Sequence, residues 1–441
     1  MSRLLLALGV LLTGVPVGLT AAAAEAVTPP PVIRHVLLNG LTVLVRSDAS
    51  VGVVAASLQV RAGSLFETAD TAGITNFLHR VMIRGTRQHT AVLLTEAIED
   101  LGGSLDASGD VEYGEVRGTA LARSWEPLLR LMAEVALRPT LPPDEIERER
   151  RLIQSALQTR GDTPFQRALD SVLRDLYGPH PYAWPSVGRR ESIERIGRDA
   201  LQAHYAAIYR PDRMVLAVSG NVPGDKVMRA AERLFRDMPR PPAPMNVSAV
   251  EARPRAERRL VERPVQQAQV LVGYLGPSLV DPDYAAVRVL GTVLGGGMSG
   301  RLFRELRDRR GLAYSVGVLG SFRTGPSFLV TYLGTAPPNA EAAEAGVLAE
   351  IERVRGEAIT EGELARAKAF LLGNLAMDRR TSASHAWYMA FFEVIGAGWD
   401  FPDRYARAVD AVTIADVARV AQRYLTRPTV VVLQPPKGPG R

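Results

Sequence analysis

The chain has 441 residues, of which 46% are hydrophobic, and it carries a formal net charge of +6. This length is sufficient for two domains of ordinary size, each with its own hydrophobic core. The chain contains no cysteine, which excludes a disulfide framework. Its basic residues are spread through arginine-rich segments and do not gather with aromatic residues, so the composition argues against a nucleic-acid-binding surface.

Residues 1–26 have the pattern of a secretory signal. Arg3 supplies the positive charge, Leu4–Leu12 forms an apolar run, and alanines occupy positions 21–26 apart from Glu25. An uncleaved membrane anchor is the alternative, but glycine and proline interrupt the apolar run. We therefore expect cleavage near Ala24–Ala26, a periplasmic or secreted mature protein, and no membrane attachment after cleavage.

The mature chain divides into two halves at a proline-rich linker, residues 239–256. The N-terminal lobe is expected at 30–238 and the C-terminal lobe at 257–436. Each half begins with strand-like segments, continues with helices and closes with an apolar, β-rich stretch, namely Met214–Ser219 and Thr429–Leu433. The order of segments predicts an α+β protein made of two similar lobes.

An amphipathic helix is predicted in the first half, before Gly85. Its apolar residues recur at the helical spacing i, i+3, i+4 and i+7: Ile74, Phe77, Leu78 and Val81. Asn76 and Arg80 share the other face, with His79 beside them. Taken alone, a histidine in such a helix is more often a surface or hydrogen-bonded residue than a metal ligand.

A second helix is predicted at Leu141–Leu157, opened by two prolines and Asp144. It carries a run of glutamate and arginine residues that includes Glu149. In isolation, such a run indicates a solvated face with ion pairs worth a few tenths of a kcal/mol each.

In the second half, Gly295–Gly297 precedes a helix with an apolar stripe, and Gly311 separates that helix from a predicted strand at Leu312–Val318. No Gly-Lys-Ser/Thr follows the glycines, so this is not a phosphate-binding loop. Arg307 and Tyr314 lie seven residues apart here. Without further context, an arginine among four others and a tyrosine on a strand would both be structural.

Residues 73–86 resemble the inverted zinc motif His-x-x-Glu-His of the pitrilysin/insulinase peptidase family. In that alignment Asn76 replaces the first histidine ligand, His79 replaces the general-base glutamate, and Arg80 replaces the second histidine ligand. Arginine stays protonated and has no lone pair to donate, and an asparagine amide is a weak ligand.

The family's third ligand, a glutamate about 76 residues further on, falls on Ala156. Glu149 matches a family acidic residue seven positions before it and is retained. The resemblance therefore implies that this chain holds no zinc of its own. We also expect Arg80 to pair with Glu149, so that its charge takes the place of the metal's.

The resemblance covers nearly the whole mature chain. Residues 97–107 look like the family's helix, Gly-Gly turn and strand, with Asp106 where asparagine is usual. Residues 295–316 are close to a family segment from which an Arg and a Tyr reach the substrate across a chamber, and Arg307 and Tyr314 have that spacing. The resemblance also implies lobes with antiparallel sheets flanked by helices, and halves that close like a clam.

These observations predict a non-catalytic subunit of a periplasmic zinc metallopeptidase heterodimer, inactive alone, acting on peptides. A homologous partner would carry the zinc, and this chain would contribute Arg307 and Tyr314 to substrate binding and oxyanion stabilisation. One alternative is a stand-alone peptide-binding or chaperone-like homodimer without protease activity. Another is an enzyme with relocated ligands, although the six histidines (35, 79, 89, 180, 204 and 385) show no local ligand spacing.

Overall fold

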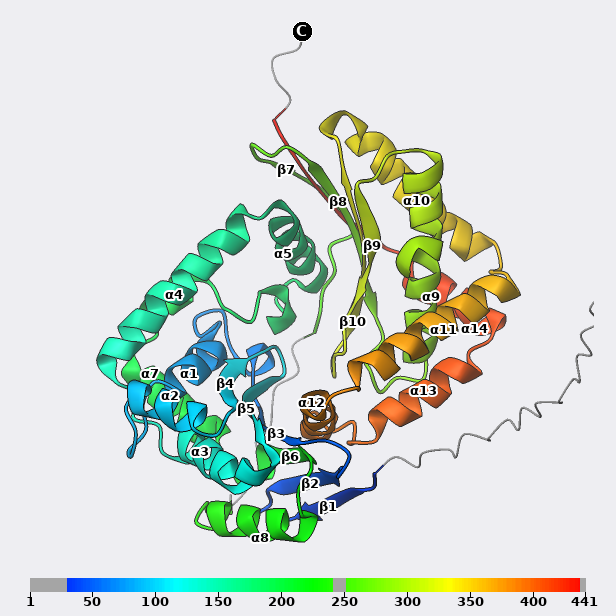
Figure 1. The fold of residues 1–441 in the computed structure, drawn as a ribbon. Coiled ribbons are helices and arrows are strands. Elements are labelled where there is room, and N and C mark those ends of the chain that lie inside the picture. Colours follow the sequence, from blue (N-terminus) through cyan, green and yellow to red (C-terminus); the bar gives the residue numbers. More distant parts are fainter. Residues whose placement is uncertain (1–29, 241–250, 437–441) are drawn as a thin grey trace, which may run out of the picture.

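The computed structural model describes residues 30–240 and 251–436, which form two lobes, each built on one β-sheet (Figure 1). The predicted signal segment and the centre of the linker lie outside these residues. The strands of the first sheet are β1 (Val32–Val36), β2 (Thr42–Ser47), β3 (Val53–Arg61), β4 (Ser104–Gly109), β5 (Tyr113–Leu121) and β6 (Met214–Gly220). Those of the second are β7 (Arg258–Glu262), β8 (Ala268–Gly276), β9 (Ser315–Gly320), β10 (Ser327–Thr335) and β11 (Thr429–Gln434).

The two sheets repeat one arrangement, which confirms the prediction of two similar lobes. Their strand orders are β1-β2-β6-β3-β5-β4 and β7-β11-β8-β10-β9. In the first sheet the last strand of the half, β6, lies between β2 and β3. In the second sheet the last strand, β11, lies between β7 and β8 in the same way. The sheets are mixed rather than purely antiparallel, because β2 pairs with β6, and β7 with β11, in parallel. The helices that precede β6 and β11 provide the long connection that a parallel pairing needs.

Fourteen α-helices in the described residues surround the sheets. In the first half they are α1 (Ile74–Met82), α2 (Ala91–Glu99), α3 (Trp125–Leu137), α4 (Pro143–Asp162), α5 (Pro164–Tyr177), α6 (Arg190–Arg195), α7 (Arg198–Ile208) and α8 (Gly224–Phe235). In the second half they are α9 (Tyr284–Gly295), α10 (Ala340–Gly356), α11 (Glu361–Asp378), α12 (Ser382–Val394), α13 (Phe401–Ala411) and α14 (Ile414–Tyr424). None of these helices combines the length and apolar character needed to cross a membrane.

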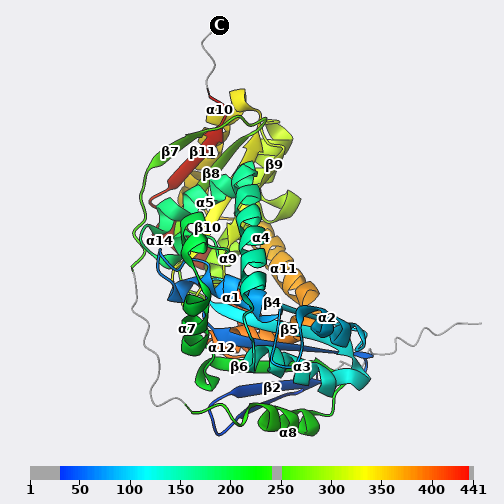
Figure 2. The same cartoon turned by 90° about the vertical axis from the view of Figure 1, so that its left-hand side faces the viewer.

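One helix from each half of the chain packs on the sheet of the other lobe. Helix α12 of the second half packs on β3 and β6, and α5 of the first half packs on β8 and β11 (Figures 1 and 2). The Phe391 ring meets the edge of Tyr113 of β5 at 5.4 Å between centroids, and Trp387 Nε1 donates to the Tyr113 hydroxyl at 3.2 Å. On the other sheet, Val172 of α5 joins a buried cluster with Leu271 and others. The two lobes are therefore interlocked through their cores.

This exchange explains the apolar pattern of the central strands. All seven residues of β6 are buried, as are eight of the nine in β8. Helices cover both faces of these strands, so apolar residues follow one another without the alternation of a half-exposed strand.

Candidate functional site

Helix α1 carries the positions at which the related zinc motif would lie. It packs against β4, β5, α4 and α7 in the first lobe. Two glycines on the strands let it approach closely. A Cβ atom at Gly114 would lie 2.1 Å from Cε1 of His79. A Cβ atom at Gly109 would lie 2.5 Å from the backbone nitrogen of Asn76. The side chains of Asn76 and His79 are consequently enclosed by the sheet.

Asn76 and His79 are buried and hydrogen-bonded within the chain. Asn76 Nδ2 donates to the Gly109 carbonyl at 3.1 Å, whereas Asn76 Oδ1 has no hydrogen-bond partner among the described residues. His79 Nδ1 lies 2.7 Å from the Thr75 carbonyl, which can only accept, so Nδ1 carries the proton. Nε2 then accepts from the Tyr209 hydroxyl at 2.9 Å. Burial lowers the pKa of His79 to about 4, so the ring is neutral and both nitrogens are engaged.

The expected ion pair between Arg80 and Glu149 is present, which confirms the predicted pairing. Glu149 of α4 is fully buried, and its Oε2 accepts from Arg80 Nε at 2.8 Å. The structure adds a second cation, because Arg84 Nε donates to Oε1 at 2.8 Å. One buried carboxylate thus joins two guanidinium groups, and this cluster bridges α1 and α4.

Ala156 lies on α4 two turns beyond Glu149, is exposed, and offers no side-chain donor atom for a metal. Across residues 30–240 and 251–436, no group of three or more histidine, aspartate or glutamate side chains has the arrangement of a metal site. Zinc requires several nitrogen, sulfur or carboxylate ligands. The α1 site provides one unpaired amide oxygen beside a cation, so its residues do not fit zinc.

Sequence reasoning missed part of this buried network. Tyr209 and His204 reach the site from the end of α7, where Thr75 Oγ1 lies 3.0 Å from His204 Nε2. Burial and the neighbouring His79 lower the pKa of His204 to about 4. Both residues are about 130 positions from α1 along the chain, and no local pattern signals their contact. The contact of Arg84 with Glu149 could have been predicted from the sequence, because Arg84 lies four residues after Arg80 and therefore on the same helical side.

Arg307 and Tyr314 lie in the second lobe and are exposed. Residues Phe303–Arg309 form a π-helix, a form that often marks functional sites. The Arg307 guanidinium lies 5.0 Å from the centroid of the Phe303 ring. Tyr314 is 59% exposed, so it is not a core residue. The strand expected from Leu312 begins only at Ser315, because the Leu312 nitrogen donates to the Leu306 carbonyl at 2.8 Å and extends the helical segment.

Two models of known families match the chain. The model described as "Insulinase (Peptidase family M16)" matches residues 42–188, and the one described as "Peptidase M16 inactive domain" matches residues 195–371. The second match begins inside the first lobe, since β6 and α8 belong to the first sheet and its flanking layer.

Curated relatives and solved structures agree with the family models. An uncharacterized zinc protease of Mycobacterium tuberculosis is 30% identical over 400 residues, which cover 89% of this chain and 91% of that protein. Another, of Mycobacterium leprae, is 29% identical over 411 residues, or 92% of each chain. A crystal structure of a protease from Helicobacter pylori has a TM-score of 0.85 at 22% identity, covering 92% of this chain and all of that one. A structure of a peptidase M16 inactive domain from Pseudomonas fluorescens has a TM-score of 0.85 at 23% identity, covering 93% of this chain and all of that one.

Proposed function

Because this chain belongs to the insulinase family of peptidases (peptidase family M16), we propose that it is a non-catalytic peptidase subunit. In this proposal it binds peptides together with a homologous, zinc-bearing partner. The observation that carries the proposal is the ion-paired cluster of Arg80, Arg84 and Glu149 at the place where the family's motif would hold a metal.

The α1 site is unsuited to hydrolysis for a second reason. His79 stands at the position of the general base, but its side chain has no exposed surface and both ring nitrogens are hydrogen-bonded. A general base must reach the proton that it removes, directly or through one water. Substrate has no path to His79 without displacement of Tyr209 or of the sheet. The site therefore serves the packing of α1 rather than catalysis.

The contribution of this chain would come from Arg307 and Tyr314. A guanidinium group can hold a peptide carbonyl or carboxylate with two aligned donors. A phenol hydroxyl can donate to the oxyanion that forms at the scissile carbonyl, an interaction worth about 2–4 kcal/mol when well placed. Both side chains are exposed on one short segment, and Arg307 forms no ion pair with a described residue, whereas the nearby Arg301 and Arg309 do.

The peptide would bind along a sheet edge. Strand β4 is the last strand of the first sheet and β9 the last strand of the second, so each leaves one side without a partner strand in the described chain. An extended peptide can add to such an edge through backbone hydrogen bonds. We place the complex in the periplasm, on the basis of the signal-like residues 1–26.

The proposal is tested by assaying peptide cleavage and zinc content of the purified chain, alone and mixed with a homologue that has an intact His-x-x-Glu-His motif. The expected result is no cleavage by the chain alone, and cleavage by the mixture with zinc in the partner only. Full activity of the isolated chain would refute the proposal. Tight peptide binding by a homodimer, with no activity gained from any partner, would also refute it and favour the stand-alone peptide-binding reading.

A further inference from the structure

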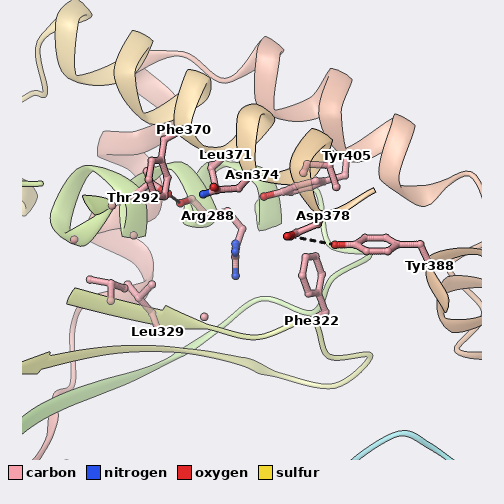
Figure 3. A pocket seen from close by; sticks show the side chains of 16 residues that line it. Arg288, Thr292, Phe322, Leu329, Phe370, Leu371, Asn374, Asp378, Tyr388 and Tyr405 are labelled. Carbon is pink, nitrogen blue, oxygen red and sulfur yellow. Dashed lines mark hydrogen bonds between the residues drawn. The ribbon is translucent and has the colours of Figure 1, made fainter. Parts of the chain in front are cut away.

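A cavity of about 380 Å³ opens in the second lobe, and its lining includes no residue of α1 and neither Arg307 nor Tyr314. It lies between α9, α11 and the strands β9 and β10, and Tyr388 of α12 and Tyr405 of α13 close one end (Figure 3). This volume is in the range of pockets that hold small molecules. Neither the family's zinc motif nor the proposed role of this chain uses it.

Arg288 of α9 directs its guanidinium group into the middle of this cavity (Figure 3). The group lies 5.3 Å from the centroid of the Phe322 ring, and its polar neighbours are the hydroxyls of Tyr284 and Tyr405. Burial raises the pKa of both hydroxyls above the ordinary value for tyrosine. They are therefore neutral and do not compensate the charge of Arg288.

Two other arginines of the same lobe are neutralised by carboxylates. Arg301 pairs with Glu363 at 2.8 Å, and Arg258 pairs with Glu344 at 2.8 Å. Arg288 forms no ion pair with a described residue, although it is half-buried. A partly desolvated guanidinium without a counter-ion is a strong binding group for a carboxylate.

The walls around Arg288 are suited to an apolar group. Val318, Phe322 and Leu329 line the strand side, and Leu371 lies on α11. The remaining wall has glycines, whose missing side chains create the space. A Cβ atom at Gly320 would lie 2.7 Å from a terminal nitrogen of Arg288.

The lining also carries the opposite charge. Asp378 and Asn374 lie one turn apart on α11, both exposed, and the Tyr388 hydroxyl donates to Asp378 at 3.4 Å. Asp378 is the one carboxylate among the described lining residues, and it forms no ion pair with Arg288. A cation and an anion that line the same cavity without pairing with each other offer separate partners for the two charges of an amino acid.

We propose that this cavity binds a free α-amino acid with an apolar side chain, its carboxylate on Arg288 and its ammonium group near Asp378. The carboxyl terminus of a peptide shares the first contact but has no free amine beside it, so the two ligands can be told apart.

Calorimetric titration of the full chain with leucine, leucinamide and N-acetyl-leucine tests the proposal. Leucine is expected to bind, and leucinamide to bind roughly 10- to 100-fold more weakly because it lacks the carboxylate. Arg288→Gln should abolish leucine binding, while Arg353→Gln, an arginine of the same lobe on α10 outside the cavity, should leave it unchanged.

Asp378→Asn provides an independent test, because Asp378 is exposed and its replacement should not disturb folding. It should weaken leucine but not N-acetyl-leucine, which carries no charge at that end. Absence of leucine binding, or unchanged binding by Arg288→Gln, would overturn the proposal. Equal binding of leucine and N-acetyl-leucine, with no effect of Asp378→Asn, would also overturn it and indicate a peptide carboxyl terminus. These measurements use the isolated chain, so they do not depend on the proposed peptidase partnership.

Discussion

Replacing Glu149 with glutamine would remove a buried negative charge that two guanidinium groups share. Glu149 has no exposed surface, and Arg80 and Arg84 each contact one of its oxygens at 2.8 Å. Breaking a buried ion pair by removing one partner destabilises a protein by about 3–5 kcal/mol. The two arginine side chains are 34% and 33% exposed, so water screens part of their charge and we expect the lower end, about 3 kcal/mol.

Urea unfolding of the isolated chain, followed by circular dichroism, measures this loss. Arg80→Gln alone should lose only about 1 kcal/mol, because Arg84 still neutralises Glu149. The variant that combines Arg80→Gln with Glu149→Gln should lose less unfolding free energy than the sum of the two single losses, since the residues form one cluster. Glu147→Gln is the matched control on the same helix, as Glu147 is 57% exposed. A loss in Glu149→Gln no larger than in this control would refute the reasoning.

Three further predictions follow from the same geometry. Arg307→Ala and Tyr314→Phe should each lower kcat of the complex roughly 100-fold while leaving unfolding unchanged, and Arg309→Ala should change neither; equal loss in all three would contradict the assignment. The folded pKa of His79 is about 4 against an ordinary 6.5, so the unfolded chain binds more protons in this window. The free energy of unfolding should therefore fall by up to about 3 kcal/mol as the pH drops from 6.5 to 4. If His79→Gln showed the same dependence of stability on pH as the wild-type chain, the role of His79 in this loss would be contradicted. Trp387→Ala should destabilise the chain by about 3 kcal/mol and speed amide exchange in the first sheet, and an effect confined to the second lobe would contradict the helix exchange.

The local pattern of the sequence was sufficient to predict helix α1, because the spacing of its apolar residues depends only on helix geometry. The Arg80–Glu149 pair was also predictable, but only through the resemblance, since 69 residues separate the two. The antiparallel sheets implied by that resemblance needed correction, as each contains one parallel pair.

Contacts between distant segments were beyond sequence reasoning. Tyr209 reads as an ordinary helix-end tyrosine, and only folding brings its hydroxyl to His79. The exchange of α5 and α12 was missed for a similar reason. An apolar helix face shows that the helix packs on something, but not on which of two similar sheets. Arg288 likewise shows no sequence signal, because its lack of a carboxylate partner is a property of the packed lobe.

Elemental analysis for zinc, after equilibration of the isolated chain with the metal, tests the central claim most directly. The matched control is a variant with Asn76→His, His79→Glu, Arg80→His and Ala156→Glu, which restores the family's ligand set. The account predicts far less than one zinc per wild-type chain and a large increase in the variant. Stoichiometric zinc in the wild-type chain, lost on Asn76→Ala, would contradict it.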